Sequence, residues 1–396
     1  MVQRRHSPRF DTLWWNDLGA ITKPMRRALF ILWLISLPSY AGFDDKYNVE
    51  RPVFNSQLSD ALQKTLEKVK RILNSDNISA SLYISDRCYW EGAAGVTKQD
   101  PGALVDSDMI FGFASITKTF IAAIVLQLVE EKRLGLEDPL GKWLQKYPNI
   151  DENITIRQLL NHGSGLDDFF VGESYRSELE TDLNRVWLPE EVLKYVGPPP
   201  DIGFTPPKYS NTNYILLGMI IETITGMSLE QELQNRITRP LQLDSTYLAK
   251  NDIKPERWAN NTALFNALYS GIWAAGAIVS TSREIAKWSQ KLYSGKFLQP
   301  ASLESMLITE PRRIGRWGLP MGLGVWKFKV DGKSAWGHGG RLYPFISRTF
   351  YMPELGLSVA YSYSWTELGA QPIPGNHLVR AYISNRPNNI SMCFDT

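Results

Sequence analysis

Cysteine and histidine are scarce in this chain. Its 396 residues include only two cysteines, Cys88 and Cys393, and four histidines. There is no Cys-x-x-Cys pair and no cluster of Cys and His, so we predict neither a metal site nor a cofactor. Two cysteines are also too few for a disulfide framework. One bridge from the C-terminal tail to the domain and two separate thiols both fit the sequence.

An excess of one charge is absent as well. The 43 basic and 41 acidic side chains leave a formal charge of +2. This near-balance gives no electrostatic reason to expect nucleic acid or an anionic membrane as a partner, and we predict neither. A hydrophobic content of 43% and a charged content of 21% are typical of a globular chain with a core.

Apolar runs long enough to cross a membrane are missing from the N-terminus. The apolar run from Ala28 to Leu37 is shorter than the roughly 20 residues that span a bilayer as a helix. Two arginines precede this run after Met25, and Ser39-Tyr40-Ala41 supplies small residues at a cleavage site. The order predicts an export signal within residues 1–41, translation from Met25, and a periplasmic or secreted protein with no stable membrane span after cleavage. An uncleaved interfacial segment is the alternative.

Two common catalytic or binding motifs are also absent. The chain has no Gly-x-Ser-x-Gly elbow, which disfavours a Ser/His/Asp hydrolase of the α/β type. No complete phosphate-loop pattern occurs, so nucleotide binding is unsupported.

The hydrophobic pattern indicates strands at both ends of the chain. Residues 55–73 repeat leucine or valine at helical spacing, and 79–86 and 88–96 resemble strands. Strand patterns return after residue 280, before a closing helix. We therefore expect an α/β fold of the α+β type in one domain, 42–396: an antiparallel sheet built from both chain ends with flanking helices, and a mostly helical insertion at about 138–258.

The stretch FGFASITK, residues 111–118, brings a serine and a lysine together at the start of an apolar helix. Ser115 stands where backbone N–H groups are unpaired, and Lys118 lies on the same helix face. A lysine in apolar surroundings has a lowered pKa and can act as a base. This is the only Ser-x-x-Lys in the chain, and the helix that follows is apolar on almost all sides, as a buried helix is.

Two further elements carry groups suited to the same chemistry. Tyr209-Ser210-Asn211 places a phenol and a carboxamide two residues apart, as a proton shuttle and an amide-recognition group. His338-Gly339-Gly340 is the only His-x-Gly, and its glycines allow a backbone to approach a ligand closely.

In this order, the three elements resemble the serine β-lactamase and penicillin-binding family, in its class C β-lactamase and D-alanyl-D-alanine carboxypeptidase branch. Connecting segments such as IRQLLNHGSGL and AAGAIVSTSREIAKW are similar too. The resemblance extends from about Asn55 to Trp365 and implies a β-lactamase/transpeptidase-like fold. One departure is FTPPKYSN, which is shorter than the family's usual approach to Tyr-x-Asn and lacks its glycine.

The resemblance implies a role for each motif residue. Ser115 would attack a carbonyl, while Lys118 and Tyr209 would move its proton, with either of them as the base. Asn211 would hold the substrate's amide oxygen, and the N–H groups of Ser115 and Arg341, the residue after Gly340, would form the oxyanion hole. His338 would orient the site or contact a substrate carboxylate.

Other candidate residues receive structural interpretations. Tyr147-Pro148-Asn149 and Ser75-Asp76-Asn77 match related motifs but are predicted to be turns. His162 is expected to bond nearby backbone, and Asp167 and Asp168 are interpreted as loop charges.

The expected activity is acyl-enzyme hydrolysis of D-alanyl peptides or related amides by an exported enzyme. The alternatives are a carboxylesterase, a class C β-lactamase and a penicillin-binding sensor or scaffold with weak turnover. Histidine in the third motif, where β-lactamases of this class carry lysine, argues against efficient antibiotic hydrolysis. The ligand would be a small peptide, a β-lactam or an ester; the sequence does not indicate an oligomeric state.

Overall fold

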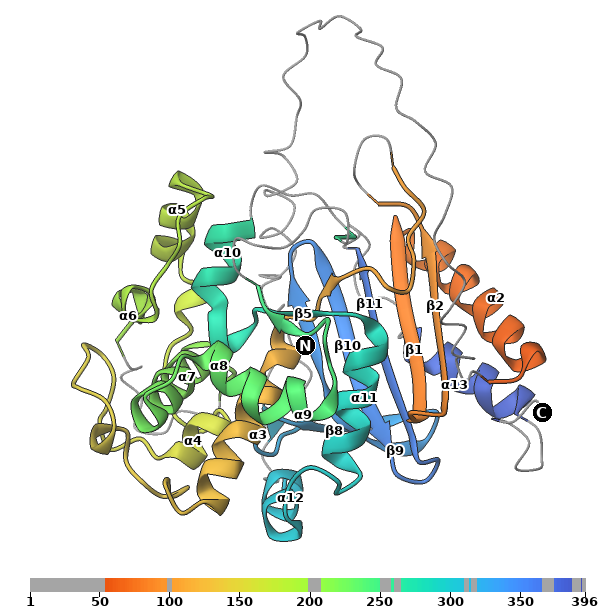
Figure 1. The fold of residues 1–396 in the computed structure, drawn as a ribbon. Helices are drawn as coiled ribbons and strands as arrows, with labels where there is room; N and C mark the ends of the chain where they lie inside the picture. The colour runs from red at the N-terminus through yellow and green to blue at the C-terminus, as the bar shows by residue number, and fades with distance from the viewer. Residues whose placement is uncertain are drawn as a thin grey trace, which may run out of the picture.

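A six-stranded antiparallel sheet forms the centre of the molecule, with the strand order β2-β1-β11-β10-β9-β8 (Figure 1). The computed structural model describes residues 54–97, 102–198, 208–249, 258–259, 265–309, 313–314, 319–364, 374–386 and 393, and the predicted export signal lies outside them. The strands of the sheet are β1 (Asn77–Ser85), β2 (Cys88–Gly95), β8 (Trp326–Val330), β9 (Lys333–Leu342), β10 (Phe345–Met352) and β11 (Leu357–Ser364).

The two ends of the chain meet inside this sheet. Strand β1 pairs antiparallel with β11, in a register that runs from Ile78 opposite Tyr363 to Tyr83 opposite Ser358. Helices α2 (Ser56–Leu73) and α13 (Pro374–Asn385) contact each other on one face of the sheet, while α11 (Ser282–Tyr293) contacts β1, β10 and β11 from the other (Figure 1). The predicted sheet built from both chain ends is confirmed.

Helix α2 shows how the sequence pattern produces this arrangement. Asn55 caps it by accepting a hydrogen bond from the backbone N–H of Leu58, which satisfies one of the free donors of the first turn. Five apolar side chains at helical spacing are buried: Leu58, Leu62, Leu66, Val69 and Leu73. The predicted amphipathic helix is therefore present, with its apolar stripe on the sheet.

The chain between β3 (Phe111–Gly112) and β5 (Ile278–Ser280) is mostly helical. Its helices are α3 (Thr117–Glu130), α4 (Ile156–Leu160), α5 (Glu173–Thr181), α6 (Pro189–Val192), α7 (Thr212–Thr225), α8 (Leu229–Leu233), α9 (Arg239–Leu241) and α10 (Phe265–Ile272). Short strands β3, β5 and β4 (Tyr247–Leu248) form a second sheet; β6 (Arg313–Ile314) pairs with β7 (Leu319–Pro320), and α12 (Pro300–Leu307) follows α11. The 138–258 boundary of the insertion stays a prediction.

Helix α3 is the buried helix that the sequence predicted. Nearly all of its residues, from Thr117 to Leu126, are shielded from solvent, as is Leu128. It ends at Glu130. Ser115 precedes the helix in a short 3-10 turn, Ala114–Ile116, and does not cap α3 itself.

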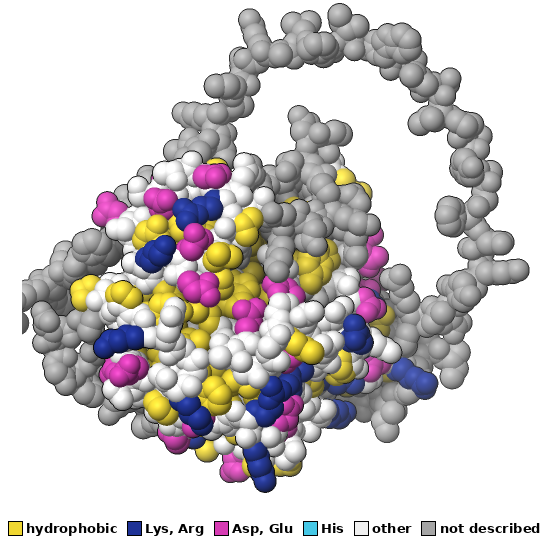
Figure 2. Space-filling view, turned by 60° about the vertical axis from the view of Figure 1, so that its left-hand side comes forward, with side chains coloured by type: hydrophobic (Ala, Val, Ile, Leu, Met, Phe, Trp, Pro, Cys, Tyr) yellow, Lys and Arg dark blue, Asp and Glu magenta, His cyan; other side chains and the backbone are white. Residues whose placement is uncertain are grey.

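The surface carries charges of both signs in close mixture. Figure 2 shows basic and acidic side chains interspersed with apolar ones over the side of the molecule where α5, α6 and α7 lie, in keeping with the formal charge of +2. Within the described ranges, none of the helices has the length and apolar character needed to cross a membrane.

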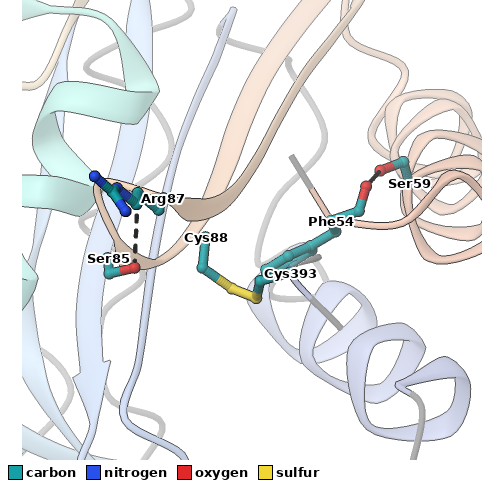
Figure 3. The surroundings of a disulfide bond; sticks show 6 residues. All are labelled: Phe54, Ser59, Ser85, Arg87, Cys88 and Cys393. Carbon is teal, nitrogen blue, oxygen red and sulfur yellow. Dashed lines mark hydrogen bonds between the residues drawn. A yellow bond between two sulfur atoms is a disulfide. The ribbon is translucent and has the colours of Figure 1, made fainter. Parts of the chain in front are cut away.

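Cys88 and Cys393 form a disulfide, with their Cα atoms 5.2 Å apart. The bond joins the beginning of β2 to the C-terminal tail (Figure 3). Of the two possibilities that the sequence left open, the structure thus has the bridge and not two separate thiols.

Because a cross-link across 305 residues reduces the conformational freedom of the unfolded chain, Cys88→Ser should lower the free energy of unfolding by about 2 to 4 kcal/mol.

Denaturant unfolding of both single variants and the double variant checks this prediction. Cys88→Ser, Cys393→Ser and the double variant should lose the same amount, since each removes the same bond. An unchanged unfolding midpoint in all three would show that the bond does not contribute.

Candidate active site

Ser115 lies where the backbone turns from strand β3 into helix α3. The preceding residue, Ala114, has a φ of 49°, in the left-handed region that costs a non-glycine residue about 1 kcal/mol. Its neighbours hold this turn in place: the Thr117 hydroxyl donates to the carbonyl of Ala114 at 2.6 Å and accepts from the N–H of Ile278 at 2.9 Å. The strained turn is thus fixed by contacts on both sides, a common feature of functional sites.

The Lys118 amine is buried directly behind Ser115. Its Nζ lies 3.2 Å from Oγ of Ser115, 2.8 Å from Oδ1 of Asn211 and 2.6 Å from the carbonyl oxygen of Ala275. Lys118 has no exposed surface. Burial in this apolar helix lowers the pKa of Lys118 from its ordinary value, and the nearby Asp168 carboxylate partly offsets the effect.

Asn211 connects this amine to a buried carboxylate. Its Oδ1 accepts from Lys118, while its Nδ2 donates to Oδ2 of Asp168 at 3.0 Å. Asp168 is only 5% exposed, and its Oδ1 accepts from the backbone N–H of Phe170 at 3.2 Å. Burial raises the pKa of Asp168, and the positive charge of Lys118 and these hydrogen bonds act in the opposite direction.

The interpretation of Asp168 as a loop charge is therefore wrong. Only its neighbour Asp167 behaves in that way, since its partly exposed carboxylate pairs with Lys208 at 3.1 Å. The two adjacent aspartates look equivalent in sequence. The side chain of Asp168 instead caps a short helical turn at Phe169–Val171, and this contact places its carboxylate beside the site.

Tyr209 covers the other side of the lysine. The Lys118 amine lies 5.0 Å from the centre of the Tyr209 ring. The Tyr209 hydroxyl is buried and interacts with the Ser115 side chain, which favours the phenolate, but burial dominates and raises the pKa of Tyr209 above its ordinary value. Its contact with Ser115 is not a well-formed hydrogen bond, and no other partner for this hydroxyl lies among the described residues.

His162 supports Tyr209 from behind. The two rings are stacked with centroids 4.2 Å apart. The Nδ1 atom of His162 accepts from the backbone N–H of Ser210 at 3.1 Å, so the ring holds the loop that carries Tyr209 and Asn211. Burial and the charge of Lys118 lower the pKa of His162 well below its ordinary value, which keeps the ring neutral.

His338 is fully buried on β9. Its Nδ1 lies 2.6 Å from the carbonyl oxygen of Gly339, which can only accept, so Nδ1 carries the proton and Nε2 has the lone pair. The ring stacks on Trp326 at 4.3 Å. Burial and the nearby Lys118 lower the pKa of His338 to about 3, so the ring is neutral. Of the two predicted roles, orientation of the site fits this state, whereas a neutral ring offers no charge to a carboxylate.

Gly340 lets β9 lie against the backbone that leads into Ser115. A Cβ atom at this position would meet the carbonyl oxygen of Phe113 at 2.2 Å and Oγ of Ser347 at 2.3 Å, so only glycine fits. Ser347 itself donates to the Phe113 carbonyl at 2.9 Å. Because side chains alternate along a strand, Arg341 extends to the opposite face from His338 and Gly340 and is exposed, which leaves its backbone as the part beside the site.

The structure thus brings Ser115, Lys118, Tyr209, Asn211 and His338 into one cluster.

Tyr147 lies elsewhere, in a surface pocket with Trp143, Met219 and Glu222. Ser75 and Asp76 lie between α2 and β1, and Asn77 is the first residue of β1. Sequence reasoning missed Asp168, Trp326 and the Ala275 carbonyl. Only Ala275 had a signal, since it lies in the AAGAIVSTS segment. Across the described ranges, no group of three or more Cys, His, Asp or Glu side chains could hold a metal ion.

The model of the Beta-lactamase family matches residues 69–382, so the chain belongs to this family. Together with the fold and the site, this match confirms the resemblance to the serine β-lactamase and penicillin-binding family that the sequence predicted.

Several characterised proteins are similar to the chain. Penicillin-binding protein 4* of Bacillus subtilis is 29% identical over 239 residues, which cover 54% of this chain and 51% of that protein. The chain thus spans about half the length of this relative. A D-stereospecific amidohydrolase from Streptomyces sp. has a TM-score of 0.68 at 26% identity, covering 82% of this chain and 98% of its own. The D-amino acid amidase of Ochrobactrum anthropi SV3, complexed with L-phenylalanine amide, has a TM-score of 0.71 at 25% identity, covering 84% and 100%.

Proposed function

We propose that this chain is an exported hydrolase that cleaves D-alanyl peptides and related D-amino-acid amides through an acyl-enzyme on Ser115. The observation that carries the proposal is the buried Lys118 amine 3.2 Å from the Ser115 hydroxyl. The similarity to a D-stereospecific amidohydrolase and a D-amino acid amidase supports the substrate class. The predicted export signal supports a site of action outside the cytoplasm.

Hydrogen-bond chemistry supports Lys118 as the base. A neutral amine has two hydrogens and one lone pair, and two of its three neighbours, the Asn211 and Ala275 oxygens, can only accept. The hydrogens therefore go to these two oxygens, and the lone pair is left for the hydroxyl of Ser115. In this arrangement Lys118 takes the proton as Ser115 attacks the substrate carbonyl.

Tyr209 is better suited to protonating the leaving group, the step that completes acylation. Its raised pKa keeps the phenol protonated, so it is a poor base for Ser115. The same phenol can pass a proton to the leaving amine and receive one from Lys118 in return. The N–H groups of Ser115 and Arg341 would stabilise the oxyanion, where a single donor contributes about 3 kcal/mol.

The neutral His338 narrows the substrate class. A carboxypeptidase substrate ends in a carboxylate, for which a cation is the natural partner. The histidine at this position is buried and neutral. We therefore expect D-amino-acid amides and peptides with uncharged ends to be better substrates than peptides with a free terminal carboxylate.

A substrate panel tests the proposed function. Purified protein should release ammonia from D-alanine amide and D-phenylalanine amide, and D-alanine more slowly from D-alanyl-D-alanine peptides, with little action on the L-isomers. Turnover of short-chain esters alone would point to a carboxylesterase, and rapid hydrolysis of a chromogenic cephalosporin to a class C β-lactamase. Stable labelling by penicillin with no turnover of any substrate would indicate a binding sensor. Each of these results would replace the proposal.

A further inference from the structure

The orientation of the Asn211 carboxamide decides which groups face the Lys118 amine. If the oxygen of this amide lies toward Lys118, as it does here at 2.8 Å, it takes one amine hydrogen. If the amide were rotated by half a turn, its two N–H hydrogens would face the amine and compete with Ser115 for the lone pair. The proposed base therefore depends on one side-chain rotamer of Asn211.

Asp168 supplies the contact that selects this rotamer. Its Oδ2 accepts from Nδ2 of Asn211, and its Oδ1 accepts from the backbone N–H of Phe170. Both neighbours are donors, so the position needs an acceptor at each end of the side chain. Carboxylate oxygens meet this need, whereas an amide has an acceptor at only one end.

We infer that Asp168 is a positioning residue: its carboxylate holds the Asn211 amide nitrogen, turns the amide oxygen to Lys118 and so leaves the lysine lone pair for Ser115. The inference rests on the proposed acyl-enzyme mechanism. Burial makes the arrangement rigid, since both Asp168 and Asn211 are less than a tenth exposed. Water is thus largely kept from substituting for the hydrogen bond between them.

The Asp168→Asn variant separates this role from simple packing. The new amide has nearly the same shape. Its oxygen can accept from the fixed backbone N–H of Phe170, and its nitrogen then faces Asn211. Asn211 must turn its oxygen toward residue 168 and its hydrogens toward Lys118. The variant also removes the negative charge that favours protonated Lys118.

Both changes act on Lys118 in the same direction. Loss of the charge and the approach of amide hydrogens each disfavour the ammonium form, so the pKa of Lys118 should fall. The other groups around the amine do not oppose this, because the Tyr209 and Tyr214 rings are uncharged and His162 and His338 are neutral. The ascending limb of the pH–rate profile should therefore move to lower pH.

The test compares Asp168→Asn with Asp167→Asn, the matched control at the adjacent, partly exposed aspartate. Burst kinetics with a nitrophenyl ester measure acylation from pH 5 to 10. We expect Asp168→Asn to acylate roughly 100-fold more slowly, the usual cost of a misplaced catalytic group, and its limb to move to lower pH. The control should match wild type. A slower rate with an unmoved limb would mean that Asp168 acts only in packing and would overturn the inference.

A second measurement does not depend on turnover. The ε-carbon of Lys118 can be titrated by NMR in protein labelled with ¹³C-lysine, and its signal identified by its absence from Lys118→Arg. The pKa of Lys118 should be lower in Asp168→Asn than in Asp167→Asn; equal values would overturn the inference. If wild type proved inactive on every substrate, the proposed function would fail, and this titration would still decide the role of Asp168.

Discussion

Ser115→Ala is expected to abolish formation of the acyl-enzyme, with a loss of turnover of about 10⁴-fold or more, because removing a catalytic nucleophile leaves only binding and oxyanion stabilisation. Intact-mass spectrometry after incubation with penicillin, together with D-amino-acid amide turnover, measures both effects. The smaller side chain fits the same turn, so the unfolding midpoint should change little.

A surface serine provides the matched control. Ser107 lies in a loop, where its hydroxyl contacts the neighbouring Asp106, and Ser107→Ala should retain wild-type labelling and turnover. If Ser115→Ala were labelled and turned over substrate as wild type does, another residue would be the nucleophile and the proposed mechanism would be wrong.

Lys118→Arg has the second largest expected effect. Arginine stays protonated at every accessible pH, so it keeps the positive charge but supplies no lone pair to Ser115. We expect acylation to fall by about 10³-fold, within the range for loss of a general base. Lys118→Met, which is unbranched and uncharged, should show a similar loss. Thermal unfolding of both variants identifies any contribution from misfolding.

The pH profile of wild type gives the matching signature. A base must be deprotonated, so activity should rise with pH through the pKa of Lys118, which burial moves below the ordinary lysine value of 10.5. The rising limb should be absent from Lys118→Arg. If that variant kept the limb at the wild-type position, Tyr209 or another group would be the base.

Much of the fold was predictable because its elements have clear periodicity. Helix α2 and strands β1 and β2 follow directly from apolar spacing, and the return of strand patterns late in the chain predicted the shared sheet. The start of α3 was less certain. Ser115 was expected at the first turn of the helix. Local sequence does not reveal that Ala114 adopts a left-handed backbone conformation and that a 3-10 turn precedes the helix.

The candidate site was predictable only where its residues belong to recognisable catalytic motifs. Ser115, Lys118, Tyr209 and His338 were found through motifs. Asp168 was misjudged because its burial arises from tertiary contacts to Asn211, far along the chain, while its neighbour Asp167 remains at the surface. The charge of His338 was also beyond sequence reasoning, because a histidine's charge depends on burial and on nearby cations, which here lower its pKa.

The pairing of β1 with β11 determines when the catalytic centre can be completed during synthesis. Ser115 and Lys118 emerge from the ribosome early, but β9, which lies beside them, is made more than half a chain later and is held in place by β10 and β11. Contacts so distant in sequence form slowly. A nascent or truncated polypeptide that ends before β11 would therefore contain the nucleophile, its amine and β9, but not the strand that joins β9 and β10 to β1. It should be catalytically silent until the last strand joins the first.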